Sequence, residues 1–137
     1  MDAADLIARL KLQPHPEGGW YRETWRSEAA LPDGRAAGTS ILFLLEAGQR
    51  SHWHRVDAEE MWIFQAGQAL MLRTAQGSNI TETRLGPGPG QSPQHLVRTH
   101  EWQAAEADRG WALVACVVVP GFRFEGFELA PPGWTPS

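Results

Sequence analysis

His52, His54 and Glu60 stand close together in the segment 48–67, which reads GQRSHWHRVDAEEMWIFQAG. Because alternate side chains of an extended strand point to the same side, His52 and His54 are expected to share one face of a strand. Glu60 belongs to the following strand, and pairing of the two strands would bring its carboxylate to both imidazoles. Two imidazole nitrogens and one carboxylate form a ligand set suited to Fe, Mn, Ni or Zn. The alternative is a polar pair that decorates the exposed face of a strand.

The same residues can also do chemistry without a metal. A histidine held by a carboxylate can abstract a proton next to a carbonyl group, and a phenol can return it. In this interpretation His54 is the base, Glu60 orients its ring, and Tyr21, the only tyrosine of the chain, is the acid.

The elements that position these residues are expected to be short strands separated by turns. One short helix is predicted over residues 2–12, within an N-terminal segment 1–13, and a tail over 131–137. Glycine, proline, asparagine and aspartate recur between the apolar runs, where hairpins need them. Strands are expected at residues 19–26, 39–45, 52–56, 60–65, 69–74, 80–84, 94–98, 101–106, 111–119 and 122–129. So many short strands predict an all-β sandwich or closed barrel, and the absence of a linker predicts a single domain over 1–137.

The composition excludes several classes of partner. The 137 residues carry a formal net charge of −4 without any cluster of lysine or arginine, so nucleic acid is not expected to bind. No stretch approaches the ~20 apolar residues that span a membrane. The first residues lack the features of a signal peptide, and we expect the protein in the cytoplasm.

The apolar run 111–119 contains the only cysteine, Cys116. A single thiol forms no internal disulfide, which fits a reducing compartment, and apolar neighbours would raise its pKa and make it a poor nucleophile. Since the run is apolar on both strand faces, both sides of it must be covered. A central strand or a subunit interface would do this, and the second possibility predicts a homodimer.

The segment 48–67 resembles the first conserved motif of the cupins, in which His-x-His and a glutamate stand between two glycines. Further stretches resemble the cupin-5 subgroup, whose function is unknown: PHPEGGWYRETWRS (14–27), TSILFLLEAG (39–48), SPQHLVRTHEWQAAEA (92–107) and VVPGFRFEGFEL (118–129). The resemblance implies a double-stranded β-helix, the small jelly-roll barrel of the cupins, with a short N-terminal helix. It also implies an interior ligand and a likeness to sugar-nucleotide epimerases.

The candidate site residues match the family pattern to different degrees. His54 and Glu60 match positions typical of the subgroup, whereas His52 matches only the general metal-cupin motif. Gln103 stands where the second cupin motif has a metal-binding histidine. Because an amide binds transition metals less well than an imidazole, we expect a divalent metal (Ni, Zn, Mn or Fe) at low occupancy at most.

Other residues are candidates for ligand contacts. Arg22 could bind an anionic substrate, although an arginine beside a glutamate also reads as a solvated ion pair. Trp62 is expected on the same strand face as Glu60, so its ring could form part of the pocket wall. The resemblance adds Gln94 as a residue that faces the pocket and Gln103 as a further ligand contact.

Together these observations predict a cupin that binds a small polar metabolite in its barrel. It could be an isomerase or epimerase that acts on a sugar-like or carboxylate substrate. The alternatives are a non-catalytic metabolite-binding module and a metal-dependent oxygenase or isomerase that uses His52, His54 and Glu60.

Overall fold

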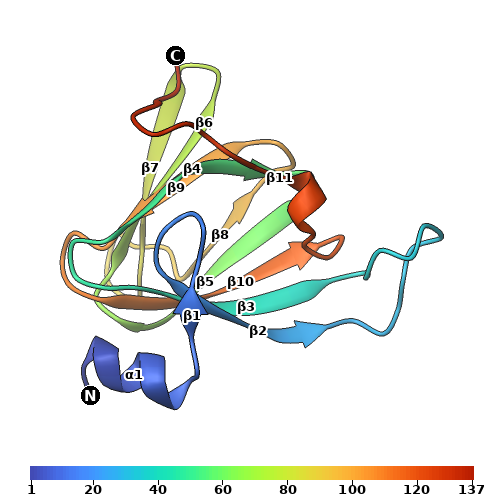
Figure 1. Cartoon of the computed structure of the whole chain (residues 1–137). Helices are drawn as coiled ribbons and strands as arrows, with labels where there is room; N and C mark the ends of the chain where they lie inside the picture. The colour runs from blue at the N-terminus through green and yellow to red at the C-terminus, as the bar shows by residue number, and fades with distance from the viewer.

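The computed structural model describes residues 1–137 and consists of two antiparallel sheets that enclose a common core (Figure 1). The first sheet has the order β1 (Gln13–Pro14), β2 (Trp20–Arg26), β3 (Thr39–Leu45), β10 (Ala112–Val119), β5 (Glu59–Gly67) and β8 (Gln94–Val97). The second has the order β11 (Phe127–Leu129), β4 (Arg50–Val56), β9 (Trp102–Glu106), β6 (Leu70–Gln76) and β7 (Asn79–Leu85). The predicted all-β jelly-roll architecture is confirmed.

The helix α1 (Ala3–Arg9) is shorter than the predicted 2–12. It begins with a capping box, in which the side chains of Asp2 and Asp5 each accept a hydrogen bond from the backbone N–H of the other. It ends before Lys11, whose φ of 56° lies in the left-handed region. No helix of the structure is long and apolar enough to cross a membrane.

Strand β10 lies at the centre of the first sheet, between β3 and β5. Its inner face contributes Val114 and Cys116 to the main core, while Leu113 on the outer face packs against Leu6 of α1. The outer face is covered only in part, because Val117 is half-buried and Val119 is 50% exposed. The homodimer stays a prediction.

The segment 122–129 was expected to be one strand, and this is wrong for its first half. Residues Phe124–Gly126 form a short 3₁₀-helix, η1, and only β11 pairs with β4. Thr39 Oγ1 accepts the backbone N–H of Phe122 at 2.9 Å, and the Gly126 carbonyl accepts that of Asp57 at 3.1 Å. These contacts hold the segment in a turn across one end of the barrel, where its phenylalanines cluster.

The interior of the barrel has two unlike parts. One is filled by a cluster of apolar side chains from both sheets, which includes Phe43, Leu72 and Val114. The other holds buried polar side chains, namely Glu17, Thr39, Ser51, His54, Glu60, Thr74 and Gln103. Burying polar groups is costly unless they are hydrogen-bonded, so the second part is the place to look for function.

Candidate functional site

A β-bulge in β4 decides which histidine enters the barrel. Ser51 pairs with Ala105 and His54 pairs with Gln103, so two residues of β4 stand opposite one residue of β9. The extra residue shifts the alternation, and both Ser51 and His54 are buried. His52 instead lies outside the cavity, where its Nε2 is 2.9 Å from the carbonyl oxygen of Pro131. The expectation that His52 and His54 share a face is therefore wrong.

Glu17, which the sequence analysis did not select, is the partner of His54. Its Oε2 lies 2.9 Å from His54 Nδ1 and also accepts a hydrogen bond from the Ser51 hydroxyl. The turn that carries Glu17 is joined to β4 by the N–H of His52, which donates to the Glu17 carbonyl. Gly18 permits this close approach, because it has a φ of 105° and a Cβ there would collide with the Arg50 carbonyl oxygen. The expected role of Glu60 as the group that orients His54 belongs to Glu17.

The charge of His54 follows from this contact. Burial alone would lower the pKa of His54, but the charge and hydrogen bond of Glu17, together with Glu60, raise it to about 9. Burial opposes ionisation of Glu17 as well, yet the His54 charge keeps the pKa of Glu17 below its ordinary value. At neutral pH the pair is an imidazolium and a carboxylate. The two polar contacts that the protein makes to the His54 ring, with Glu17 and with the His52 carbonyl at 2.7 Å, both use Nδ1, which leaves Nε2 for a ligand.

His15 also lines the cavity. Its Nδ1 accepts the backbone N–H of Glu17 at 3.2 Å, and burial lowers the pKa of His15. The ring is therefore neutral, and its 3.3 Å approach to Glu17 Oε1 is not an ion pair. The ring stands edge-on to Tyr21, with centroids 4.5 Å apart.

Glu60 is held by a chain of hydrogen bonds that runs from Trp62, on the same strand β5, through Gln103 of the second sheet. Trp62 Nε1 donates to Gln103 Oε1 at 2.7 Å, and Gln103 Nε2 donates to Glu60 Oε1 at 3.0 Å. Since the indole can only donate, it fixes the orientation of the amide. Burial, helped by the charge of Glu17, raises the pKa of Glu60 to about 6. Burial also raises the pKa of the Cys116 thiol, as expected from its apolar neighbours.

Trp62 and Gln103 do not line the cavity, contrary to the expectation that they bind the ligand. Both are almost fully buried behind Glu60, with exposed fractions of 1% and 0%. They support the carboxylate from the core side and have no surface to offer a ligand.

Arg22 and Gln94 also lie elsewhere than expected. Both are exposed, and neither lines the cavity. Alternation along β2 explains the first case, because Tyr21 faces the cavity and its neighbour Arg22 faces away. Gln94 pairs with Ile63 at the edge strand β8.

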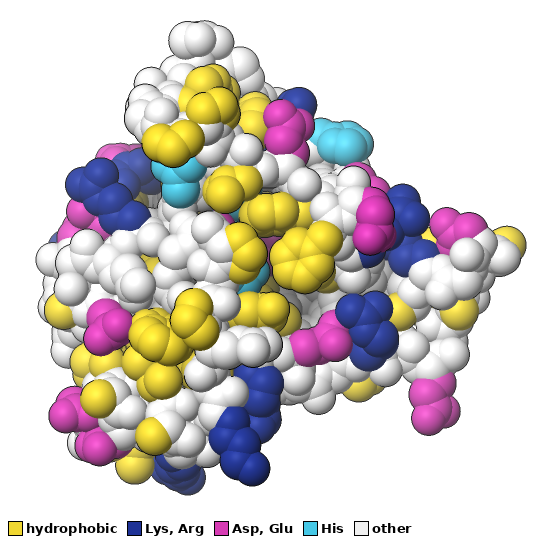
Figure 2. Space-filling view, viewed as in Figure 1, with side chains coloured by type: hydrophobic (Ala, Val, Ile, Leu, Met, Phe, Trp, Pro, Cys, Tyr) yellow, Lys and Arg dark blue, Asp and Glu magenta, His cyan; other side chains and the backbone are white.

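The cavity has about 30 Å³ of free space, room for about two water molecules. Figure 2 shows a hollow near the middle of one face, bordered by hydrophobic side chains, with histidine and acidic side chains visible inside it. The polar lining consists of His15, Glu17, Tyr21, Thr39, His54 and Glu60. The apolar lining consists of Ile41, Val56, Val118, Phe122 and Phe127.

The residues do not fit the predicted metal site. His52 lies outside the cavity, His54 is protonated through its pairing with Glu17, and a glutamine amide takes the place of a third imidazole. No three histidine, cysteine, aspartate or glutamate side chains are arranged to hold an ion. The expected set of His52, His54 and Glu60 is therefore not assembled.

Comparisons with known proteins match this architecture. Residues 4–130 match the family Cupin_5, described as "Cupin superfamily (DUF985)". A protein of Shewanella oneidensis with a solved structure is 41% identical, with 95% of this chain and 85% of that chain covered and a TM-score of 0.90. A hypothetical protein of Leishmania major is 30% identical, with 95% and 88% covered and a TM-score of 0.87.

More distant structures share the fold alone. A variant of oxalate decarboxylase from Bacillus subtilis is 15% identical, with 85% of this chain and 29% of that chain covered and a TM-score of 0.62. No curated protein matches the sequence significantly.

Proposed function

This chain belongs to the Cupin_5 family (DUF985) of the cupin superfamily, and we propose that it moves a proton on a small polar metabolite bound in its barrel. The cupin barrel is a fold that binds small molecules, but fold alone does not decide between binding and catalysis. The proposal rests on the side chains inside the cavity.

The observation that carries the proposal is a buried carboxyl and a buried imidazole that line one cavity, both with raised pKa values. Burial raises the pKa of Glu60 to about 6, and Glu17 raises that of His54 to about 9 against the effect of burial. At neutral pH Glu60 is a base close to its own pKa, and His54 is an acid. A base and an acid with shifted pKa values in one cavity are typical of acid–base catalysis.

These charges suit abstraction of a proton next to a carbonyl group. Glu60 takes the proton from carbon, the electrons of the C–H bond move onto the carbonyl oxygen, and His54 Nε2–H donates to that oxygen. Return of the proton to the opposite face of the same carbon gives an epimer. In a hydroxy carbonyl compound, protonation of the former carbonyl carbon and its oxygen, with loss of the hydroxyl proton from the carbon first deprotonated, gives an isomer. Tyr21 lines the same cavity and is our candidate for the acid on the opposite face.

These roles differ from the predicted ones, in which His54 was the base. An imidazole with a pKa of about 9 holds its proton at neutral pH and cannot accept another. We therefore assign the role of the base to Glu60. Its only cationic neighbour in the cavity is His54.

Deuterium exchange tests the proposal without knowledge of the natural product. Small hydroxy ketones and aldoses are incubated with the protein in D₂O, and NMR follows deuterium incorporation at the carbon next to the carbonyl. Glu60→Gln is expected to slow exchange about 100-fold or more, the range of general acid–base catalysis. Glu59→Gln is the matched control, because its carboxylate is exposed on the same strand.

Equal exchange rates in wild type and Glu60→Gln would contradict the proposal. Binding of the same compounds, detected by saturation-transfer NMR, without any exchange above the buffer rate would favour a metabolite-binding module instead.

A further inference from the structure

We infer that the ligand of this cavity carries a protonated amine, beside a hydroxyl or carbonyl oxygen, on the part that enters the barrel. This inference rests on the proposed function and narrows its substrate class. It favours an amino-substituted metabolite over the carboxylate substrate that the sequence also allowed.

The first support is the balance of charge. Two carboxylates, Glu17 and Glu60, line the cavity together with one imidazolium, His54, and no lysine or arginine lines it. His15 is neutral, since its Nδ1 accepts the Glu17 N–H. The cavity therefore holds one negative charge in excess even when His54 is fully protonated. A buried charge without a partner is costly, and a cationic ligand would supply the partner.

The second support is the aromatic lining. Tyr21, Phe122 and Phe127 all contribute to the cavity wall. The ring of Phe127 lies 5.8 Å from that of Phe122 and 5.6 Å from that of His54, so the rings gather around one space. Aromatic faces attract an organic cation that approaches within about 6 Å. A carboxylate would gain nothing from these rings and would be repelled by Glu60.

The size of the cavity limits the charged group. Free space of about 30 Å³ admits a head such as an aminomethyl group in place of about two water molecules. An adjacent oxygen on the same ligand would accept the hydrogen bond that His54 Nε2 has to offer.

The remainder of the ligand would lie in the mouth groove, an adjoining hollow of about 420 Å³ that shares Tyr21, Ile41 and Phe122 with the cavity. Phe124 adds a further ring to its wall. Its charged residues balance one another: Glu23, Glu125, Arg26 and Arg123. We therefore expect this part of the ligand to be uncharged and held by apolar contact.

A matched set of three probes tests the inference. The compounds 2-amino-1-phenylethanol, 1-phenylethane-1,2-diol and mandelate share a phenyl ring and a hydroxyl, and end in a cationic, neutral and anionic group respectively. Isothermal titration calorimetry at pH 7 measures their dissociation constants. We expect the amine to bind about tenfold more tightly than the diol, a preference of the size that cation–π and charge contacts provide, and mandelate to bind most weakly.

Variants locate the source of the preference. Glu60→Gln is expected to remove most of the amine-over-diol preference, and Glu59→Gln to leave it unchanged. Phe127→Leu, which keeps the carboxylates, is expected to reduce the preference by about threefold, in line with the loss of one aromatic contact.

The inference is overturned if the diol or mandelate binds as tightly as the amine, if none of the three binds, or if Glu60→Gln keeps the full preference. Its failure is distinguishable from failure of the proposed function. Amine preference without deuterium exchange would contradict only the proton transfer, and exchange with an anionic or neutral preference would contradict only the cationic ligand.

Discussion

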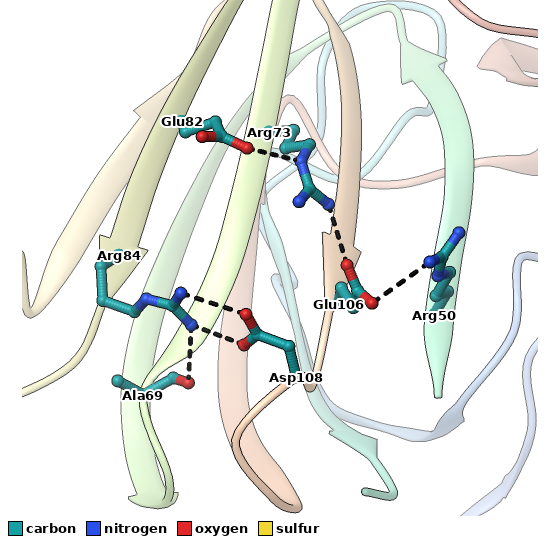
Figure 3. Close-up of polar contacts among 7 residues, drawn as sticks. All are labelled: Arg50, Ala69, Arg73, Glu82, Arg84, Glu106 and Asp108. Carbon is teal, nitrogen blue, oxygen red and sulfur yellow. Dashed lines mark hydrogen bonds and ion pairs between the residues drawn. The ribbon is translucent and has the colours of Figure 1, made fainter. Parts of the chain in front are cut away.

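Two groups of charged residues in this barrel have the same contact distances and opposite surroundings. On the outer face of the second sheet, Arg73 contacts Glu82 at 2.9 Å and Glu106 at 3.1 Å, and Arg84 contacts Asp108 (Figure 3). Inside the barrel, His54 contacts Glu17 at 2.9 Å. The exposed fractions differ most: 55% for the Glu82 side chain, against 3% for His54 and 7% for Glu17.

Surroundings, and not distance, determine what each contact does. Water screens the Arg73–Glu82 pair, so it contributes at most about 1 kcal/mol to stability. Water does not screen the charges of the buried inner pair. Each member therefore shifts the pKa of the other. The outer pairs of Arg73 link neighbouring strands at the surface of the sheet. The inner group places charged side chains in a cavity that a ligand can enter.

The largest effect is expected from Glu17→Gln, which removes one member of the inner pair. The free energy of unfolding should fall by about 3 kcal/mol, because His54 and the Ser51 hydroxyl lose a buried anionic acceptor. Urea unfolding at pH 7 measures this loss. Glu23→Gln, an exposed carboxylate paired with Arg26 on β2, is the control and should change stability little. A loss for Glu17→Gln no greater than the control's would remove the distinction between the two groups.

The inner pair should also make stability depend on pH. The pKa of His54 is about 9 in the folded protein against 6.5 unfolded, so its contribution is complete below pH 6.5 and is lost as pH rises through 9. The loss is on the order of 3 kcal/mol at 1.36 kcal/mol for each pH unit. Urea unfolding at pH 6.5, 8 and 9.5 measures it. A flat profile over this window would mean that His54 is neutral.

A smaller effect is expected from Gln103→Leu, which removes the amide between Trp62 and Glu60. The Trp62 N–H is left without an acceptor, and stability should fall by about 1–3 kcal/mol. The pKa of Glu60 should rise further, because the amide hydrogen bond favours its charged form. The chemical shift of the Glu60 side-chain carboxyl carbon, followed by NMR against pH, reports this change, and an unchanged pKa would show that the amide does not tune Glu60.

The smallest effect is expected from the outer group. A double-mutant cycle of Arg73→Gln and Glu82→Gln should give a coupling free energy of about 0.5 kcal/mol or less, reduced further at high salt. Thermal or urea unfolding at low and high salt measures it. A coupling as large as the loss caused by Glu17→Gln would show that exposure does not separate the two groups.

The sequence predicted the sheets better than the site. Strand 39–45 was predicted with its observed bounds. It is a short apolar run, and the turn residues on either side mark where the strand begins and ends. His54, Glu60 and Tyr21 were predicted to face the interior, and all three line the cavity. His52 was misplaced because a β-bulge changes the alternation without a sequence signal of its own.

Glu17 was missed for a different reason. Its contact with His54 joins residues far apart in the chain, and periodicity describes only neighbours. The available signal was the glutamate itself, which directly precedes two glycines that allow the backbone to pass close to another strand.

The charge of His54 is the central claim, and an NMR titration of its imidazole tests it most directly. Carbon and nitrogen shifts of the ring, followed from pH 5 to 10, should give a pKa of about 9 in the wild type and a value moved toward 6.5 in Glu17→Gln. A wild-type pKa near 6.5 would contradict the buried imidazolium and the assignment of Glu60 as the base.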